Sequence, residues 1–109
     1  MPQIDVTVSW DAQSSKPKPN MDPIMVPLAN GATVIQWTAD NTVASFQITG
    51  LDSAVFTAPQ SSNGGKVSTS TDRNQGPATY TYTISGTQAG TGKMGSHDPR
   101  IENGGGPLR

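Results

Sequence analysis

Apolar and polar residues alternate along several short stretches of the chain, which is the pattern of β-strands with one buried face. The alternation is most regular in residues 4–10, 33–39 and 78–85, and the last stretch places two tyrosines and Ile84 on one face. The sequence predicts weaker strands at 24–28, 44–48, 67–71 and 97–101. No stretch has a convincing helical period, so we expect an all-β protein.

Polar segments rich in glycine or proline separate these strands and predict loops. Residues 11–20 contain a Lys-Pro-Lys-Pro run and are expected to form an exposed loop, and residues 58–66 a second one. The polar stretch 67–71 is expected to be an edge strand. About seven short strands separated by such turns are typical of an antiparallel Greek-key β-sandwich of immunoglobulin-like type, so we predict one sandwich domain over residues 1–109.

Composition and charge narrow the class of protein. The chain is 32% apolar, and much of the remainder is Ser, Thr, Gly and Asn. A net charge of −1 with 14% charged residues gives no electrostatic footprint for nucleic acid or an anionic membrane. No apolar run approaches the roughly 20 residues that span a bilayer, and residues 1–5 enter a strand pattern without a secretory signal. We therefore expect a soluble cytoplasmic protein.

The chain has no cysteine and a single histidine, His97, which excludes several kinds of site. Disulfides, thiolate metal sites and a cysteine nucleophile are impossible, and a type 1 copper site would need a cysteine and two histidines. A serine hydrolase would need His97 to meet a serine and a carboxylate. Ser96 and Asp98 are its sequence neighbours, which is poor geometry for a catalytic triad, and no nucleophile-elbow motif is present.

Two carboxylate sites remain open but have little support from spacing alone. Asp98 and Glu102 are four positions apart in a predicted strand, as a glycosidase pair could be, and Asp40, Asn41 and Asp52 could bind calcium. Such residues are more often solvated. We predict no cofactor, no metal and no small-molecule substrate.

The chemistry with the most support lies in residues 96–103, Ser-His-Asp-Pro-Arg-Ile-Glu-Asn, which contain one of the two Asp-Pro bonds of the chain. An aspartate carboxylate can close a five-membered ring on its own carbonyl, and the proline nitrogen takes a proton as it leaves. His97 stands next to the bond and could donate that proton. The product would be a cyclic anhydride at Asp98, which water opens. Asp-Pro is also a common turn dipeptide, which is the structural alternative.

These residues also carry a family resemblance. Together with the Tyr-x-Tyr-x-Ile strand and Gly-rich loop before them, and with Met-Asp-Pro-Ile-Met-Val at 21–26, they resemble the DP-EP family of small bacterial proteins over essentially the whole domain. The resemblance implies a β-sandwich that cleaves one of its own Asp-Pro bonds, keeps the short C-terminal peptide in the fold and self-assembles. Transferred to this chain, the scissile bond is Asp98-Pro99 and the detached peptide is residues 99–109.

The same resemblance implies a lysine near the scissile aspartate. Lys93 is close in sequence, whereas Lys66 begins a predicted strand and is slightly favoured, because the glycines around Lys93 leave it too mobile. An exposed lysine without a role fits the sequence equally well. The second bond, Asp22-Pro23, has no adjacent histidine, and we expect it to stay intact.

We therefore expect a single-turnover, autocatalytic cleavage with Asp98 as nucleophile, partly buried among apolar strands, and His97 or a lysine assisting. The expected partner is the protein itself, as a homo-oligomer. The alternative is a non-enzymatic, immunoglobulin-like structural or protein-interaction module in which Asp98-Pro99 only begins a strand.

Overall fold

The computed structural model describes residues 1–104, and these residues confirm the all-β prediction. They form strands β1 to β11 and two single-turn 3₁₀ segments, η1 (Leu28–Asn30) and η2 (Asn63–Gly65). The expected count of about seven strands is not confirmed, because two long strands are each interrupted and two expected loops also contain strands. Neither helical segment in this range has the length and apolar character needed to cross a membrane.

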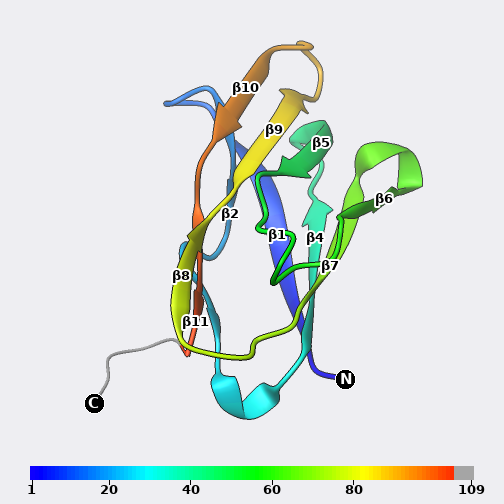
Figure 1. Cartoon of the computed structure of the whole chain (residues 1–109). Helices are drawn as coiled ribbons and strands as arrows, with labels where there is room; N and C mark the ends of the chain where they lie inside the picture. The colour runs from blue at the N-terminus through cyan, green and yellow to red at the C-terminus, as the bar shows by residue number, and fades with distance from the viewer. Residues whose placement is uncertain (105–109) are drawn as a thin grey trace.

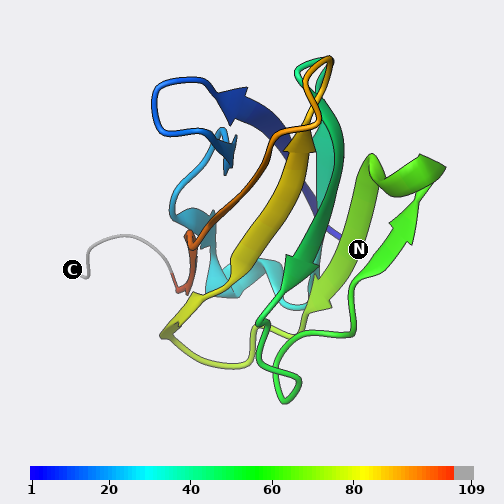
Figure 2. The same cartoon turned by 90° about the horizontal axis from the view of Figure 1, so that it is seen from above.

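One layer is a five-stranded sheet in the order β2-β1-β4-β7-β6 (Figure 1). Its members are β1 (Gln3–Asp11), β2 (Lys16–Pro19), β4 (Thr33–Ala39), β6 (Gln60–Ser62) and β7 (Val67–Asp72). β1 and β4 are parallel, so the sheet is mixed and not wholly antiparallel as expected. The expected loops contribute β2 and β6. β7 was expected at an edge, but β6 lies outside it (Figure 2) and pairs with it.

The second layer consists of two three-stranded sheets, β10-β9-β5 and β3-β11-β8. Their members are β3 (Ile24–Val26), β5 (Val43–Thr49), β8 (Ala78–Thr81), β9 (Thr83–Gln88), β10 (Met94–His97) and β11 (Arg100–Asn103). The chain passes from β8 to β9 through Tyr82, and from β10 to β11 through Asp98-Pro99 (Figure 1). The predicted pairing of the C-terminal strand with the tyrosine strand is confirmed. It is interrupted where Tyr82 lies beside Asp98-Pro99, and we call these three residues the strand break.

The core lies between the two layers. Alternate residues of β1 and β4 face it, as the sequence pattern predicts. Trp37 on β4 is fully buried and meets the ring of Tyr82 at a centroid distance of 5.5 Å. Since Tyr82 belongs to the strand break, this contact fixes the break of one layer against the central strand of the other.

Candidate functional site

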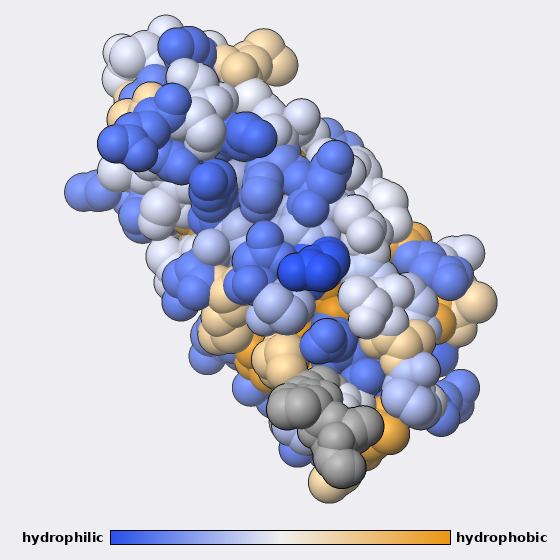
Figure 3. Space-filling model, turned by 90° about the vertical axis from the view of Figure 1, so that its left-hand side faces the viewer, coloured by the Kyte–Doolittle hydropathy of each residue, from blue (hydrophilic) through white to orange (hydrophobic). Residues whose placement is uncertain are grey.

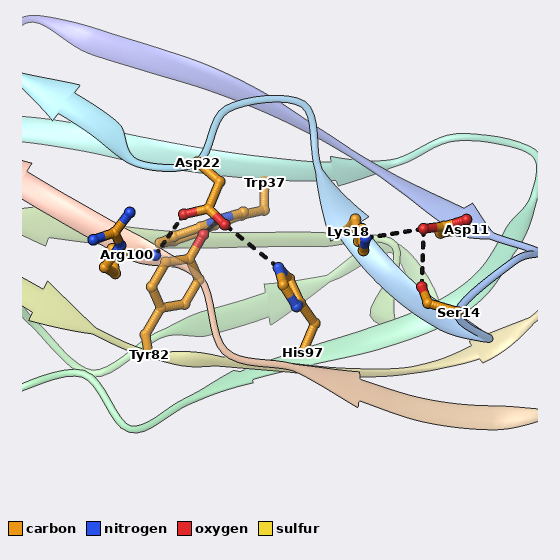
Figure 4. A network of polar contacts seen from close by, with 8 residues as sticks. All are labelled: Asp11, Ser14, Lys18, Asp22, Trp37, Tyr82, His97 and Arg100. Atoms are coloured by element: carbon orange, nitrogen blue, oxygen red, sulfur yellow. Dashed lines mark hydrogen bonds and ion pairs between the residues drawn. The ribbon is translucent and has the colours of Figure 1, made fainter.

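The strand break brings the two Asp-Pro sequences of the chain together. Asp22 lies just before β3, and its carboxylate contacts the residues on either side of Asp98-Pro99 (Figure 4). Its Oδ1 accepts a hydrogen bond from the backbone N–H of Arg100 at 3.0 Å, and its Oδ2 lies 3.5 Å from Nε2 of His97. Asp22 thus spans the expected scissile bond from one flank to the other.

The Asp98-Pro99 bond is itself held to the neighbouring strand on both sides. Oδ1 of Asp98 accepts a hydrogen bond from the Thr83 hydroxyl at 2.8 Å, and the Pro99 carbonyl accepts the Tyr82 N–H at 3.0 Å. The expected partial burial of Asp98 is wrong: Pro99 is the buried residue, and Asp98 is exposed. The face seen in Figure 3, at the left of Figure 1, is mostly hydrophilic. Water can therefore reach the carboxylate.

Tyr82 forms the buried floor of the strand break. Its hydroxyl oxygen accepts a hydrogen bond from the indole N–H of Trp37 at 3.1 Å, and Figure 4 shows this hydroxyl directed toward Asp22. Burial raises the pKa of Tyr82 well above its usual range, and the negative charge of Asp22 adds to that effect against the opposing Trp37 hydrogen bond. Tyr82 therefore keeps its proton at neutral pH and offers a donor toward Asp22.

The two lysines suggested by the sequence lie elsewhere. Lys66 precedes β7 in the other layer, where its carbonyl accepts the Ala39 N–H at 2.8 Å. Lys93 is exposed in the turn before β10. The extended strand β10 separates Lys93 from Asp98 by roughly 16 Å. Within residues 1–104, the side-chain and backbone contacts at the strand break involve His97, Asp98 and Pro99. Neither lysine takes part in them.

An ion pair between Lys18 and Asp11 supports the strand that carries His97. Lys18 Nζ lies 2.9 Å from Oδ2 of Asp11, and the Ser14 hydroxyl donates to the same oxygen (Figure 4). These hydrogen bonds lower the pKa of Asp11 to about 2, and the bond from Lys18 has the largest effect. They stabilise the turn between β1 and β2, and the Ser15 carbonyl of this turn abuts Gly95 of β10.

The carboxylates of the calcium site left open by the sequence accept hydrogen bonds within their own turns. Asp40 accepts hydrogen bonds from the Thr42 N–H at 2.9 Å and the Ser9 hydroxyl at 2.7 Å, and Asp52 accepts the Ala54 N–H at 2.9 Å. Residues 1–104 contain no group of three or more His, Asp or Glu side chains able to hold a metal ion. Asp40 and Asp52 therefore act as turn residues.

Asp22 is the residue of this site that sequence reasoning missed. Its bond to Pro23 was expected to be inert because no histidine is adjacent to it in sequence, yet folding places His97 beside it. Asp22 and Arg100 are 78 positions apart, so no local pattern reports their contact. One signal was available: both Asp-Pro pairs precede an isoleucine strand, and these strands pair with Ile24 opposite Ile101. The expected survival of Asp22-Pro23 stays a prediction.

Comparison with known proteins adds no family to this geometry. No protein-family model matches the chain. A search of curated proteins likewise finds no match.

Proposed function

We propose that the protein cleaves its own Asp98-Pro99 bond in a single turnover. The arrangement that carries the proposal is the clamp on that bond: Thr83 holds the Asp98 carboxylate, and Asp22 contacts both His97 and Arg100. An intramolecular attack needs a carboxylate held near its own carbonyl and a proton source for the leaving nitrogen. The motif in residues 96–103 supports the same reaction through its resemblance to the DP-EP family, and membership of that family is part of this proposal.

The reaction has two balanced steps. In the first, a side-chain oxygen of Asp98 forms a bond to the Asp98 carbonyl carbon, the C–N bond to Pro99 breaks, and the proline nitrogen takes up a proton. Asp98 is then a cyclic anhydride. In the second, water adds to the anhydride and leaves two carboxyl groups on Asp98. One water is consumed, and Pro99 begins the new chain as a secondary amine.

His97 supplies the proton for the leaving proline nitrogen, and Asp22 positions the His97 imidazole. The 3.5 Å contact holds the imidazole on the side of the strand break where the Arg100 N–H also binds Asp22. The hydrogen bond from Thr83 fixes the Asp98 carboxylate, and the hydrogen bond from Tyr82 fixes Pro99 on the other side of the scissile bond. Orientation of this kind contributes roughly 7–11 kcal/mol in favourable cases. The exposed carboxylate also admits the water for the second step.

Two further parts of the proposal are supported by the sequence resemblance and strand pattern: the Greek-key, immunoglobulin-like classification of the sandwich and a homo-oligomeric assembly. The expected cytoplasmic location stays a prediction. The detached peptide would be residues 99–109, of which 105–109 lie outside the described residues.

The test is the intact mass of freshly purified protein, denatured without acid or heat, and measured again after incubation at neutral pH. We expect one fragment ending at Asp98 and a second beginning at Pro99. Asp98→Ala abolishes the cleavage, since it removes the nucleophile. Thr83→Val slows it roughly fivefold, the worth of one hydrogen bond near 1 kcal/mol, and Asp22→Asn and His97→Ala slow it further. Asp52→Asn, in an exposed turn, is the matched control and cleaves at the wild-type rate.

Two results would reject the proposal. A single unchanged full-length mass would leave the non-enzymatic interaction module as the better interpretation. Fragments produced by a break at Asp22-Pro23 would assign the reaction to the other Asp-Pro bond, and their masses are distinct. A cleavage rate that is independent of dilution is expected, because the attack is intramolecular.

A further inference from the structure

A second polar site lies inside the core, where β7 meets β11, and it is separate from the strand break. Asp72, the last residue of β7, has no exposed surface, and Asn74 and Asn103 are 5% and 3% exposed. Oδ1 of Asp72 accepts hydrogen bonds from the side-chain amide of Asn103 at 2.8 Å and from the backbone N–H of Asn74 at 2.9 Å. Because Asn103 belongs to β11, its bond joins the two layers.

Three buried oxygens of this site have no hydrogen-bond partner: Oδ2 of Asp72, Oδ1 of Asn74 and Oδ1 of Asn103. All three are acceptors when the carboxyl is ionised, so they cannot satisfy one another. The side-chain N–H groups of Asn74 already donate to the carbonyls of Pro27 and Gly31. Buried acceptors without donors are rare in folded proteins, because their lost hydration is not replaced. The site therefore lacks a donor.

No charged side chain of residues 1–104 supplies that donor. Arg73 follows Asp72, but its guanidinium donates to the carbonyls of residues 53–54. On β11, Arg100 and Glu102 alternate with the inward-facing residues. The other elements packed against Asp72 present neutral side chains: Thr33 on β4, Phe56 in the segment before β6, and Asn103 on β11. Burial raises the pKa of Asp72, and the hydrogen bonds from Asn103 and Asn74 oppose this only in part.

We propose that Asp72 holds a proton in the folded protein and donates it from Oδ2 to Oδ1 of Asn103. Since the Asn103 amide already donates to the other oxygen of Asp72, the second bond closes an acid–amide pair with two hydrogen bonds. One proton then satisfies two of the three unpartnered oxygens. The pair is a proton-dependent clasp between β7 and β11. It requires only the intact fold and does not rest on the proposed cleavage.

The clasp predicts a pH dependence of definite sign. A carboxyl with a raised pKa binds more protons in the folded than in the unfolded protein. Its contribution to stability is therefore complete below the ordinary value of 3.8 and is lost as the pH rises through the folded pKa. Asp11 acts in the opposite direction, because its pKa is lowered to about 2 and its contribution is lost only in strong acid. The two effects can be separated by mutation.

The test uses the full chain carrying Asp98→Ala, so that strand scission cannot intervene, and follows the urea midpoint from roughly pH 4 to pH 9. The midpoint of this chain is expected to fall as the pH rises. Adding Asp72→Asn replaces the acid proton by an amide N–H. The decrease of the urea midpoint with pH that is due to Asp72 then disappears, while the midpoint at acid pH is kept. Adding Asp72→Ala lowers the midpoint throughout the range. Asp5→Asn, at an exposed position, is the control and keeps the slope.

A direct measurement keeps the proposal testable if a variant does not fold. The ¹³C resonance of the Asp72 carboxyl should have the position of a neutral acid at a pH where exposed aspartates are ionised. An ionised signal there would overturn the proposal, as would an unchanged slope in Asp72→Asn. A midpoint that rises with added Na⁺ or Ca²⁺ in the parent but not in Asp72→Asn would also overturn it, because a bound cation would then occupy these oxygens.

Discussion

At the scale of single residues, Tyr82 joins the core to the strand break. Its backbone N–H holds the Pro99 carbonyl, while its hydroxyl accepts the indole N–H of Trp37. The side chain is 1% exposed, so water cannot replace the hydroxyl if it is removed. Removal of the hydroxyl therefore weakens the contact with Trp37 in the core, while the backbone hydrogen bond to the Pro99 carbonyl remains.

We expect Tyr82→Phe to lower the free energy of unfolding by about 1–3 kcal/mol, because the buried Trp37 N–H loses its acceptor. Urea unfolding measures the difference. Tyr80→Phe is the matched control: this tyrosine is only partly buried and packs edge-on against Phe56 at 5.2 Å. A loss in the control as large as that in Tyr82→Phe would show that the hydrogen bond has no special weight.

At the scale of elements, β10 is positioned by the close approach of its backbone to the turn between β1 and β2. A side chain at Gly95 would collide with the carbonyl oxygen of Ser15, and the Trp10 ring lies 3.2 Å from the same point. Because the nearest atoms include backbone of residues 15 and 16, a methyl group fits only if the backbone shifts. Because β10 ends at His97, the glycine also determines where the imidazole stands.

Gly95→Ala is expected to destabilise the protein by about 1–3 kcal/mol, the usual cost of overpacking. It should also slow the proposed cleavage, since β10 must shift and take His97 with it. Thermal unfolding and the intact-mass time course measure the two effects. At Gly76 a methyl group meets no atom within 4 Å, so Gly76→Ala should change neither measurement. Equal behaviour of the two variants would contradict the packing argument.

The elements that could be predicted are those whose apolar periodicity is local. β1 and β4 alternate clearly and were expected, whereas β2 contains prolines and β6 only polar residues. Neither β2 nor β6 therefore shows an apolar alternation, although each pairs with the neighbouring strand of the chain across a short turn. β7 was misplaced at an edge because its inward side carries Ser68, Ser70 and Asp72, which look like solvent-facing residues in sequence. His97 and Asp98 share a local motif and could be found. For Asp22 the only sequence signal was the repeated Asp-Pro before an isoleucine strand, and its contacts with His97 and Arg100 depend on the fold.

At the scale of the whole molecule, β11 is the central strand of its sheet although it belongs to the peptide that cleavage would detach. β3 pairs with it on one side and β8 on the other. Ile101 is fully buried, and Asn103 bonds to Asp72 in the opposite layer. Cutting the chain at Asp98 removes one covalent link but none of these contacts.

Both fragments are therefore expected to stay together after cleavage, as one species in native mass spectrometry and size-exclusion chromatography. Ile101→Ala should loosen the peptide by about 2–5 kcal/mol, because it leaves a cavity in the core. Arg100→Ala should not, since Arg100 is exposed and binds Asp22 through its backbone N–H. Spontaneous release of residues 99–109 from the wild-type protein under native conditions would contradict this expectation.

The central place of β11 also sets a sequence of events during protein synthesis. β3 and β8 leave the ribosome before β11 does, and they cannot complete their sheet until it follows. The hydrogen bond that holds Asp22 beside the proposed scissile bond comes from the Arg100 N–H, at the start of β11. A nascent chain that lacks β11 therefore has the Asp98-Pro99 bond at most in an unfolded segment, where Asp22 does not contact its flanks. In the proposed cleavage, translation has to pass this bond before the fold can act on it, and the growing polypeptide is thereby protected from premature scission.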